Sequence, residues 1–187
     1  MGLLPITLIG DKILRKKAAE VEEVDIKTIE LIKNMFDTMH NANGIGLAAN
    51  QVGSNKSIFV VDMSVLEEYK DHNPLVFINP RIINRSDETA FVEEGCLSIP
   101  DIRGEVERPK SVTVAYQNTD LKEKTMDADD FLARVIQHEY DHLQGVLFTD
   151  LISDEMKKKV KNDILKIKKR KWEFQYPVTE DVDYQMI

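Results

Sequence analysis

The chain has almost no cysteine: Cys96 is the single one among 187 residues, so no intrachain disulfide can form. A lone thiol is typical of a protein in a reducing compartment, and we expect a cytoplasmic location. Long apolar runs are also missing, since none approaches the roughly 18 residues of a membrane-spanning helix. Residues 1–17 lack an apolar segment followed by a small-residue cleavage site, which argues against a secretory signal. We therefore expect no membrane association.

Positive charge is also scarce, because the net charge of the chain is −8. This balance argues against general binding to nucleic acid, and we expect no interaction with DNA. The charge is unevenly spread, however. Nine basic and three acidic residues lie in 154–171, which gives this segment a charge of +6 and leaves −14 for the rest. Apolar residues recur within it at helical spacing, which predicts an amphipathic C-terminal helix over 153–172.

The length and composition predict one domain. Hydrophobic residues make up 42% of the chain and charged residues 31%, and 187 residues are enough to bury a full core. We expect a single catalytic domain over 1–172. The segment 173–187, which is net acidic and contains Pro177, is expected to be a surface tail.

Apolar periodicity predicts an α+β fold in which antiparallel sheets pack around a central helix. Asp25 is a suitable N-cap for a helix over 25–41, where apolar residues recur every three or four positions. Residues 81–92 predict a hairpin that turns near 86–87. Alternation of Val112 with later apolar residues predicts a strand with one buried face. The other expected strands cover residues 57–61, 75–78 and 121–126.

The strongest chemical signal is a His-Glu-x-x-His motif that begins at His138, within a helix expected over 129–143. His138 and His142 are four residues apart, so both rings project from one helix face and can bind one metal ion. Glu139 lies near enough to exchange a proton at such a site. A surface helix with two chance histidines is the alternative. The apolar circumference of the helix favours a metal, because burying these polar groups unpaired would be costly.

The third ligand determines the class of site. Metzincin-like proteases continue the motif with Gly-x-x-His, but Phe148 occupies that position here. Glu155 is the nearest candidate for a thermolysin-like glutamate, yet it opens a lysine-rich helix. His40 and His72 have no motif around them. Cys96 follows a glycine at an expected strand end, where a thiolate would complete a three-ligand site with one open position. The alternative for Cys96 is a small buried hydrophobe.

The segment 44–53 is rich in glycine and small residues, so another chain or ligand can approach its backbone closely. It lacks the Gly-Lys-Ser/Thr ending of a phosphate-binding loop. By itself it favours a plain tight turn. Taken with 94–98 (Glu-Gly-Cys-Leu-Ser) and 137–142 (Gln-His-Glu-Tyr-Asp-His), however, it makes the chain resemble the peptide deformylases, whose three signature motifs occur in this order. The resemblance extends over residues 3–171.

This resemblance implies a metal-dependent hydrolase that removes the N-formyl group from the initiator formyl-methionine of nascent polypeptides and releases formate. Cys96, His138 and His142 would hold one divalent ion. Two imidazoles and a thiolate favour zinc by ligand preference, whereas the family typically works with Fe²⁺, which we expect here. Zn²⁺, Ni²⁺ or Co²⁺ are expected to substitute.

The resemblance also implies roles for further residues. Glu139 would take a proton from the attacking water and pass it to the departing amine. The Gln51 side-chain amide and the Leu97 backbone N–H would donate to the oxyanion. Ile45 and Gly46 would bond the peptide backbone as an added strand.

A pocket for the methionine side chain is expected near the metal site. Val135, one helical turn before His138, and Ile45 are candidates, as is Phe131 a further turn back, although packing in the core is equally consistent with the sequence for all three. By family resemblance, Glu94 and Arg103 lie near the mouth of this pocket and hold the Cys96 segment in place. A surface ion pair is the alternative for these two residues.

The expected partners are N-formylmethionyl peptides and, through the basic C-terminal helix, the ribosome. The alternative for that helix is a solvated face that carries no partner. Two rival functions remain open. A catalytically inactive relative would bind nascent peptides without hydrolysis, but the retention of Glu139 and Gln51 argues against it. A His-Glu-x-x-His endopeptidase would instead cleave internal peptide bonds.

Overall fold

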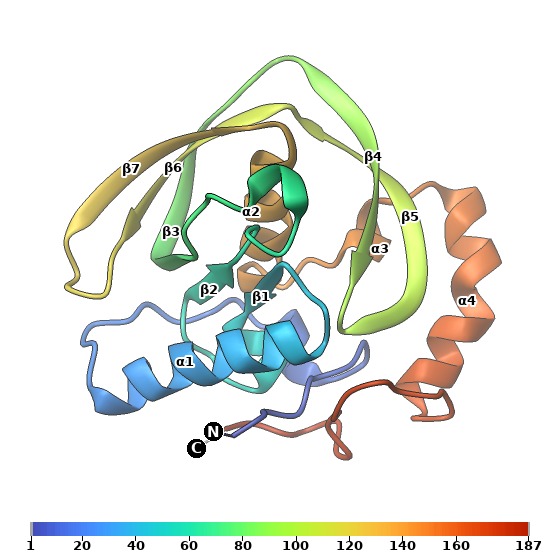
Figure 1. The fold of residues 1–187 in the computed structure, drawn as a ribbon. Helices are drawn as coiled ribbons and strands as arrows, with labels where there is room; N and C mark the ends of the chain where they lie inside the picture. The colour runs from blue at the N-terminus through green and yellow to red at the C-terminus, as the bar shows by residue number, and fades with distance from the viewer. Residues whose placement is uncertain (1, 187) are drawn as a thin grey trace.

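The computed structural model describes residues 2–186, and it places one helix, α2, inside a shell of antiparallel strands (Figure 1). One sheet has five strands in the order β1-β2-β3-β6-β7, and a second sheet pairs β4 with β5. This arrangement confirms the predicted α+β class. The strands are β1 (Gly46–Ala48), β2 (Ile58–Val61), β3 (Leu75–Arg85), β4 (Thr89–Cys96), β5 (Ile99–Pro109), β6 (Ser111–Gln117) and β7 (Glu123–Asp129).

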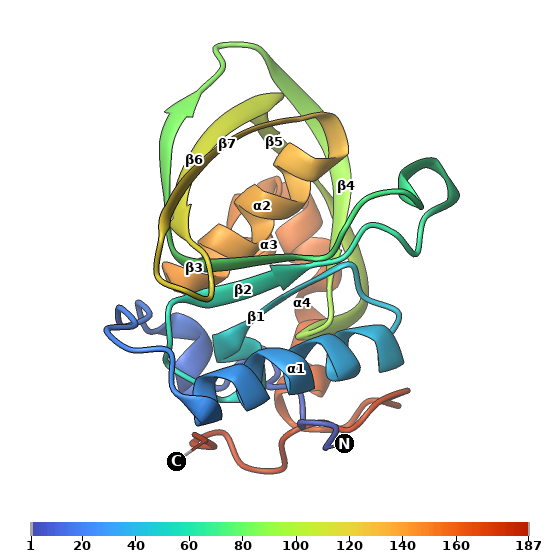
Figure 2. The same ribbon diagram turned by 60° about the vertical axis from the view of Figure 1, so that its left-hand side comes forward.

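Four α-helices and three short 3₁₀ helices complete the described chain. Figure 1 shows α4 on the outer side of β5, and Figure 2 shows α1 below the strands that enclose α2. The α-helices are α1 (Ile26–Asn41), α2 (Asp130–Leu143), α3 (Phe148–Leu151) and α4 (Asp154–Lys168). The 3₁₀ helices are η1 (Lys12–Arg15), η2 (Ala49–Val52) and η3 (Glu67–Tyr69).

The central helix α2 is buried on most of its circumference, as its sequence predicts. Ala133, Ile136 and Leu143 are fully buried, and they pack in one cluster with Phe59 and Phe77 from the five-stranded sheet. Full burial of one large apolar side chain contributes roughly 1.5–3 kcal/mol. The packing therefore fixes the helix that carries the His-Glu-x-x-His motif.

The helix α1 begins and ends where the sequence predicts. The Asp25 side chain accepts a 2.8 Å hydrogen bond from the backbone N–H of Thr28, which caps the first turn. Met35 and Met39 are fully buried against β1 and β2. This cluster supports the sheet edge at β1, which lines the functional site.

The hairpin predicted over 81–92 is wrong. Only 86–88 separate β3 from β4, yet β3 pairs with β2 and β6 in one sheet, and β4 pairs with β5 in the other. The local sequence of a short turn resembles that of a hairpin, but the choice of strand partners depends on distant residues. The chain passes here from one sheet to the other, and β4 carries Cys96 across to α2.

The predicted pairing after 111–117 is confirmed, since β6 and β7 are antiparallel neighbours. The C-terminal helix is shorter than predicted. It begins after the N-cap Ser153 but ends at Lys168 rather than at 172. Arg170 adopts a left-handed backbone conformation with φ of 53°, and its guanidinium turns back to the carbonyl oxygens of Lys168 and Thr179. These tertiary contacts terminate the helix.

Residues 173–186 lie along the N-terminal segment, at the bottom of Figure 1. Ile6 and Val178 form an isolated parallel bridge, in which the backbone N–H of Ile6 donates to Pro177 at 2.9 Å and that of Thr179 donates to Ile6 at 3.0 Å. Across the described residues, no helix is both long and apolar enough to cross a membrane.

Candidate metal centre and active site

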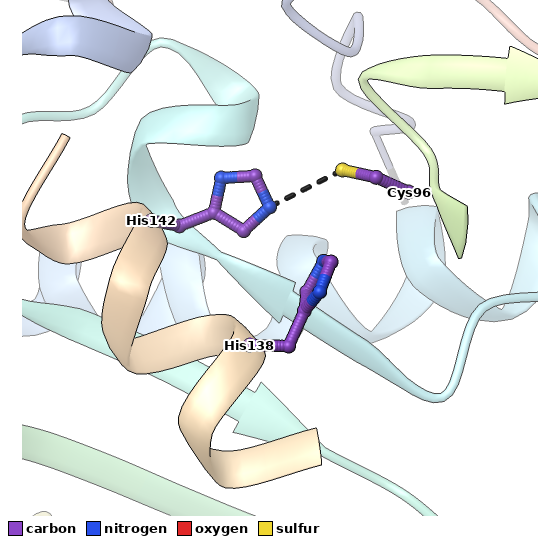
Figure 3. A group of neighbouring side chains, drawn as sticks. All are labelled: Cys96, His138 and His142. Atoms are coloured by element: carbon purple, nitrogen blue, oxygen red, sulfur yellow. Dashed lines mark hydrogen bonds between the residues drawn. The ribbon is translucent and has the colours of Figure 1, made fainter. Parts of the chain in front are cut away.

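Three side chains able to ligate a metal ion meet where β4 ends beside α2. Cys96, His138 and His142 each place one ligand atom within 4.8 Å of the others. Sγ of Cys96 lies 3.2 Å from Nε2 of His142, and Figure 3 shows both imidazole rings projecting from the same side of the helix towards the sulfur. Among residues 2–186, no other group of three such side chains gathers in this way.

A second layer of charged residues holds the ligands in place. Oε2 of Glu94 lies 2.9 Å from Nδ1 of His138, so the other ring nitrogen, Nε2, is left for a metal. Arg108 donates two hydrogen bonds to the Glu94 carboxylate and one of 2.6 Å to Asp141. Arg134 donates a further bond of 3.1 Å to Glu94. Burial would raise the pKa of Glu94, but hydrogen bonds from His138 and Arg108 lower it to about 2.

Sequence reasoning missed Arg108 and Arg134, and it placed Glu94 with Arg103 near the mouth of the pocket, with a surface ion pair as the alternative. Buried and exposed residues alternate along β5, and Arg108 lies on the buried face together with Ile102 and Val106. Arg134 lies one helical turn before His138 on the same face of α2. The alternation along the strand and the four-residue spacing along the helix were the sequence features that could have identified these two arginines. Glu94 therefore belongs to a buried network.

The charges at the three ligands suit a divalent cation. Burial lowers the pKa of His142 well below its ordinary value, which keeps the imidazole neutral, as a metal ligand must be. Burial also opposes a charge on His138, but Cys96 and Glu94 outweigh this effect and raise its pKa well above the usual range. The same surroundings that favour a proton on His138 would also favour a bound cation. The residues therefore fit a bound metal ion.

Glu139 is buried beside this centre and lines the adjoining cleft. Its Oε2 has no hydrogen-bond partner among residues 2–186. Gly46 leaves the space that the carboxylate occupies, because a Cβ at this position would lie 2.5 Å from Oε1 of Glu139. Burial raises the pKa of Glu139 to about 7. A carboxyl group with such a pKa can both accept and release a proton near neutral pH.

Gln51 is fixed with its amide nitrogen directed at the metal centre. Oε1 accepts a 2.8 Å hydrogen bond from the backbone N–H of Ala48. Nε2 lies 3.2 Å from Oγ of Ser98 and 3.5 Å from Sγ of Cys96. The side chain is almost fully buried, so it is not the solvated loop amide that a turn would present.

A cleft of about 610 Å³ opens beside the metal ligands. Its walls come from segments far apart in the sequence, including β1, the end of β4 and one face of α2. The cleft contains every substrate-binding residue predicted from the sequence. These are Ile45, Gly46, Glu94, Arg103 and Val135, and Leu97 also lines the cleft.

The rejected candidates for a third ligand lie in other environments. Nε2 of His40 lies 2.8 Å from Oδ2 of Asp62, and His72 is exposed on the loop after η3. Glu155 is exposed in the first turn of α4. Phe148 is buried and packs against His138, with the two ring centroids 6.3 Å apart.

The last residues of the cleft wall come from beyond the predicted domain boundary. Glu173, Gln175 and Tyr176 line the cleft together with the motif residues. The Tyr176 hydroxyl donates a 2.5 Å hydrogen bond to the backbone carbonyl oxygen of Leu97. Burial raises the pKa of Tyr176 well above its ordinary value, so the hydroxyl keeps its proton at neutral pH.

A thiolate and two imidazoles that can hold one metal ion, next to a buried carboxylate and an open cleft, define a metal-dependent hydrolase. Comparison with known proteins is more specific. Residues 3–158 match the family model of polypeptide deformylase, and the chain belongs to the peptide deformylase family. Members of this family are metal-dependent enzymes that remove the N-formyl group from nascent polypeptides.

The similarity extends over most of the chain. A peptide deformylase of Pseudothermotoga lettingae is 49% identical over 162 residues, which cover 87% of this chain and 90% of the relative. The solved peptide deformylase of Plasmodium falciparum has a TM-score of 0.83 at 35% identity and covers 88% of this chain and 95% of its own. The peptide deformylase of Synechococcus elongatus, solved in complex with actinonin, has a TM-score of 0.80 at 41% identity. The similarity covers 86% of this chain and 87% of that structure's chain.

Proposed function

We propose that this chain deformylates N-formylmethionyl peptides at the centre formed by Cys96, His138 and His142. The observation that carries the proposal is the convergence of these three ligand atoms within 4.8 Å, beside a buried carboxylate and a cleft wide enough for a peptide. When bound there, a divalent ion supplies a Lewis acid that polarises the formyl group and acidifies water.

Glu139 is the acid–base residue of this proposal. Its buried carboxylate faces the cleft, and its pKa of about 7 suits the transfer of a proton in both directions. Glu139 removes a proton from the attacking water and delivers it to the departing amine. The amide bond of the formyl group then breaks, and formate and a free amino terminus are released.

Gln51 and Leu97 stabilise the negative charge that develops on the formyl oxygen. The Gln51 amide is held rigid by Ala48, and its Nε2 lies beside Cys96. The backbone N–H of Leu97 follows directly after the ligand Cys96, at the end of β4. Loss of one such donor typically lowers kcat by roughly 10²–10³-fold.

The substrate peptide lies along β1. Gly46 begins the edge strand of the five-stranded sheet and lines the cleft together with Ile45, so an extended peptide can add there as a strand. Val135 contributes apolar surface to the pocket for the methionine side chain. Arg103 pairs across the sheet with Gly95 and lies at the cleft, whereas Glu94 acts by orienting His138.

The native metal is proposed to be Fe²⁺, with Zn²⁺, Ni²⁺ and Co²⁺ as substitutes. The ligand set alone accommodates each of these ions. A thiolate beside Fe²⁺ is sensitive to oxidation, so purification under anaerobic conditions should give a higher activity per bound metal than purification in air.

The basic helix α4 is proposed to dock on ribosomal RNA, which would place the enzyme in the cytoplasm near nascent chains. Its lysines are exposed, while Val160 and Ile167 are buried against the domain. Phosphate contacts make such binding fall steeply with salt. Co-sedimentation with ribosomes at low salt should be weakened by neutralising Lys166, Lys168 and Lys169. Absence of co-sedimentation, or no effect of these changes, would contradict docking.

The first experiment measures formate release from formyl-Met-Ala-Ser by protein purified anaerobically with Fe²⁺, beside a Glu139→Gln variant. We expect release by the parent and its collapse in the variant. Cleavage of internal bonds in unformylated peptides would indicate an endopeptidase instead. Metal-loaded parent protein that binds formyl peptides without releasing formate would be an inactive relative.

A further inference from the structure

The C-terminal segment touches the residue that follows the metal ligand Cys96. The Tyr176 hydroxyl donates to the carbonyl oxygen of Leu97 at 2.5 Å, and the tyrosine is only partly exposed. This carbonyl belongs to the strand end that carries both a metal ligand and the proposed oxyanion donor. Tyr176 lies outside residues 3–158, the part of the chain that the family model matches.

Tyr176 is held in place by anchors on both sides of it. Before it, Nε1 of Trp172 donates a 2.9 Å hydrogen bond to Asp101 in β5. After it, Oγ1 of Thr179 donates a 2.6 Å bond to the fully buried Asp11, which also pairs with Arg170. The segment between these anchors therefore has little freedom to leave the strand end.

Residues 6–9 of the N-terminal segment connect the C-terminal segment to the segments that carry Gln51 and Leu97. The backbone N–H of Thr7 donates 2.8 Å to the carbonyl of Gln51, and that of Ile9 donates 2.9 Å to the carbonyl of Ser98. Pro177 in turn accepts from Ile6 at 2.9 Å. The N-terminal and C-terminal segments are thus hydrogen-bonded to each other and together hold the segments that carry Gln51 and Leu97 in fixed relative positions.

We propose that Tyr176 is a positioning residue for deformylation, which acts by fixing the backbone of Leu97 through its hydroxyl group. This inference rests on the proposed role of the Leu97 N–H at the formyl oxygen. A donor displaced from the developing charge stabilises it less, although the substrate still binds. Residues 173–186 are then a part of the active site, although the sequence predicted a tail beyond a boundary at residue 172.

The test compares Tyr176→Phe with two matched controls. Tyr176→Phe removes the hydroxyl group and keeps the ring. Tyr116→Phe removes a hydroxyl group that bonds to none of residues 2–186, on a strand away from the cleft. Asp183→Asn removes an exposed ion pair between the C-terminal segment and Lys12. Each full-length variant is compared by steady-state kinetics on formyl-Met-Ala-Ser and by backbone hydrogen exchange.

We expect Tyr176→Phe to lower kcat about fivefold, the effect of one net hydrogen bond, with KM changed less than about twofold. Hydrogen exchange in 96–99 should accelerate by a similar factor, while α1 and β6 keep the exchange rates of the parent. Both controls should match the parent in kcat and in exchange of 96–99. A uniform acceleration over the whole chain would indicate a general loss of stability and would overturn the proposal.

Unchanged kcat together with unchanged exchange of 96–99 would also overturn it. Faster exchange at 96–99 with a normal kcat would show that the hydroxyl orders this segment without affecting the reaction, which refutes the positioning role as well. Failure of the proposed function is distinguishable, because the parent itself would then release no formate, whereas the exchange measurement needs no turnover.

Discussion

Oε2 of Glu94 lies 2.9 Å from Nδ1 of His138, and the same carboxylate is bound by the buried guanidinium of Arg108. The pair fixes the orientation of the imidazole ring before any metal binds. An exposed carboxylate could not do this as well, since water would compete for the ring nitrogen. The rigidity of the proposed metal centre therefore depends on residues that do not themselves ligate metal.

Glu94→Gln should weaken metal binding by about 10–100-fold, because the amide is a poorer acceptor for the ring N–H. Metal retained during dialysis against a graded chelator measures the effect. Glu105→Gln, on the exposed face of the neighbouring strand β5, is the matched control and should retain metal like the parent. Equal retention in all three proteins would refute the orienting role of Glu94.

Gly46→Ala should lower kcat/KM by about 100-fold, as expected for a catalytic group that is displaced by about 1 Å. The new Cβ would lie 2.5 Å from Oε1 of Glu139, so the carboxylate must move. Steady-state deformylation of formyl-Met-Ala-Ser measures the change. Gly2→Ala, with no atom within 4 Å of its added Cβ, controls for the substitution itself and should behave as the parent. Normal kinetics for Gly46→Ala would contradict the geometry.

Removal of the metal should lower the temperature of unfolding, and its return should restore it. Ligand in about 100-fold excess over its Kd stabilises the folded state by about 2.7 kcal/mol. Calorimetry with and without Co²⁺ measures the shift in the parent and in Cys96→Ala. The variant should show a much smaller shift, because it lacks one of the three ligands. An equal shift in both proteins would place the ion elsewhere.

Arg170→Ala should destabilise the fold by about 3 kcal/mol, because it leaves the fully buried carboxylate of Asp11 without its charged partner. Denaturant unfolding measures this change in the free energy of unfolding. Lys12→Ala breaks an exposed ion pair with Asp183, which water and salt screen, and should destabilise the fold much less than Arg170→Ala. A similar decrease in the free energy of unfolding in the two variants would show that the buried pair stabilises the fold no more than the exposed one.

Much of the local structure could be predicted from the sequence. The bounds of α1 follow from an N-cap at Asp25 and a repeating apolar pattern, both of which are properties of adjacent residues. The strands β6 and β7 follow in the same way from alternation and a turn. The hairpin expected over 81–92 failed because a turn sequence does not specify which strands will pair.

The candidate site was likewise predictable in part. Three short motifs were enough to select Cys96, His138 and His142, and the structure brings their ligand atoms together. The metal it holds and the roles of the cleft residues remain predictions. The partners of Glu94 were not predicted, since arginines in a charged strand resemble surface residues until the buried face of β5 is known.

By itself, the sequence determined the motif-bearing helix, the three side chains proposed as metal ligands and the family, because each depends on residue type and short-range spacing. Only the tertiary structure decided that Arg108 is buried under the ligands and that Tyr176 reaches Leu97. Contacts between segments 79 residues apart depend on how the whole chain packs, and short-range spacing contains no information about them.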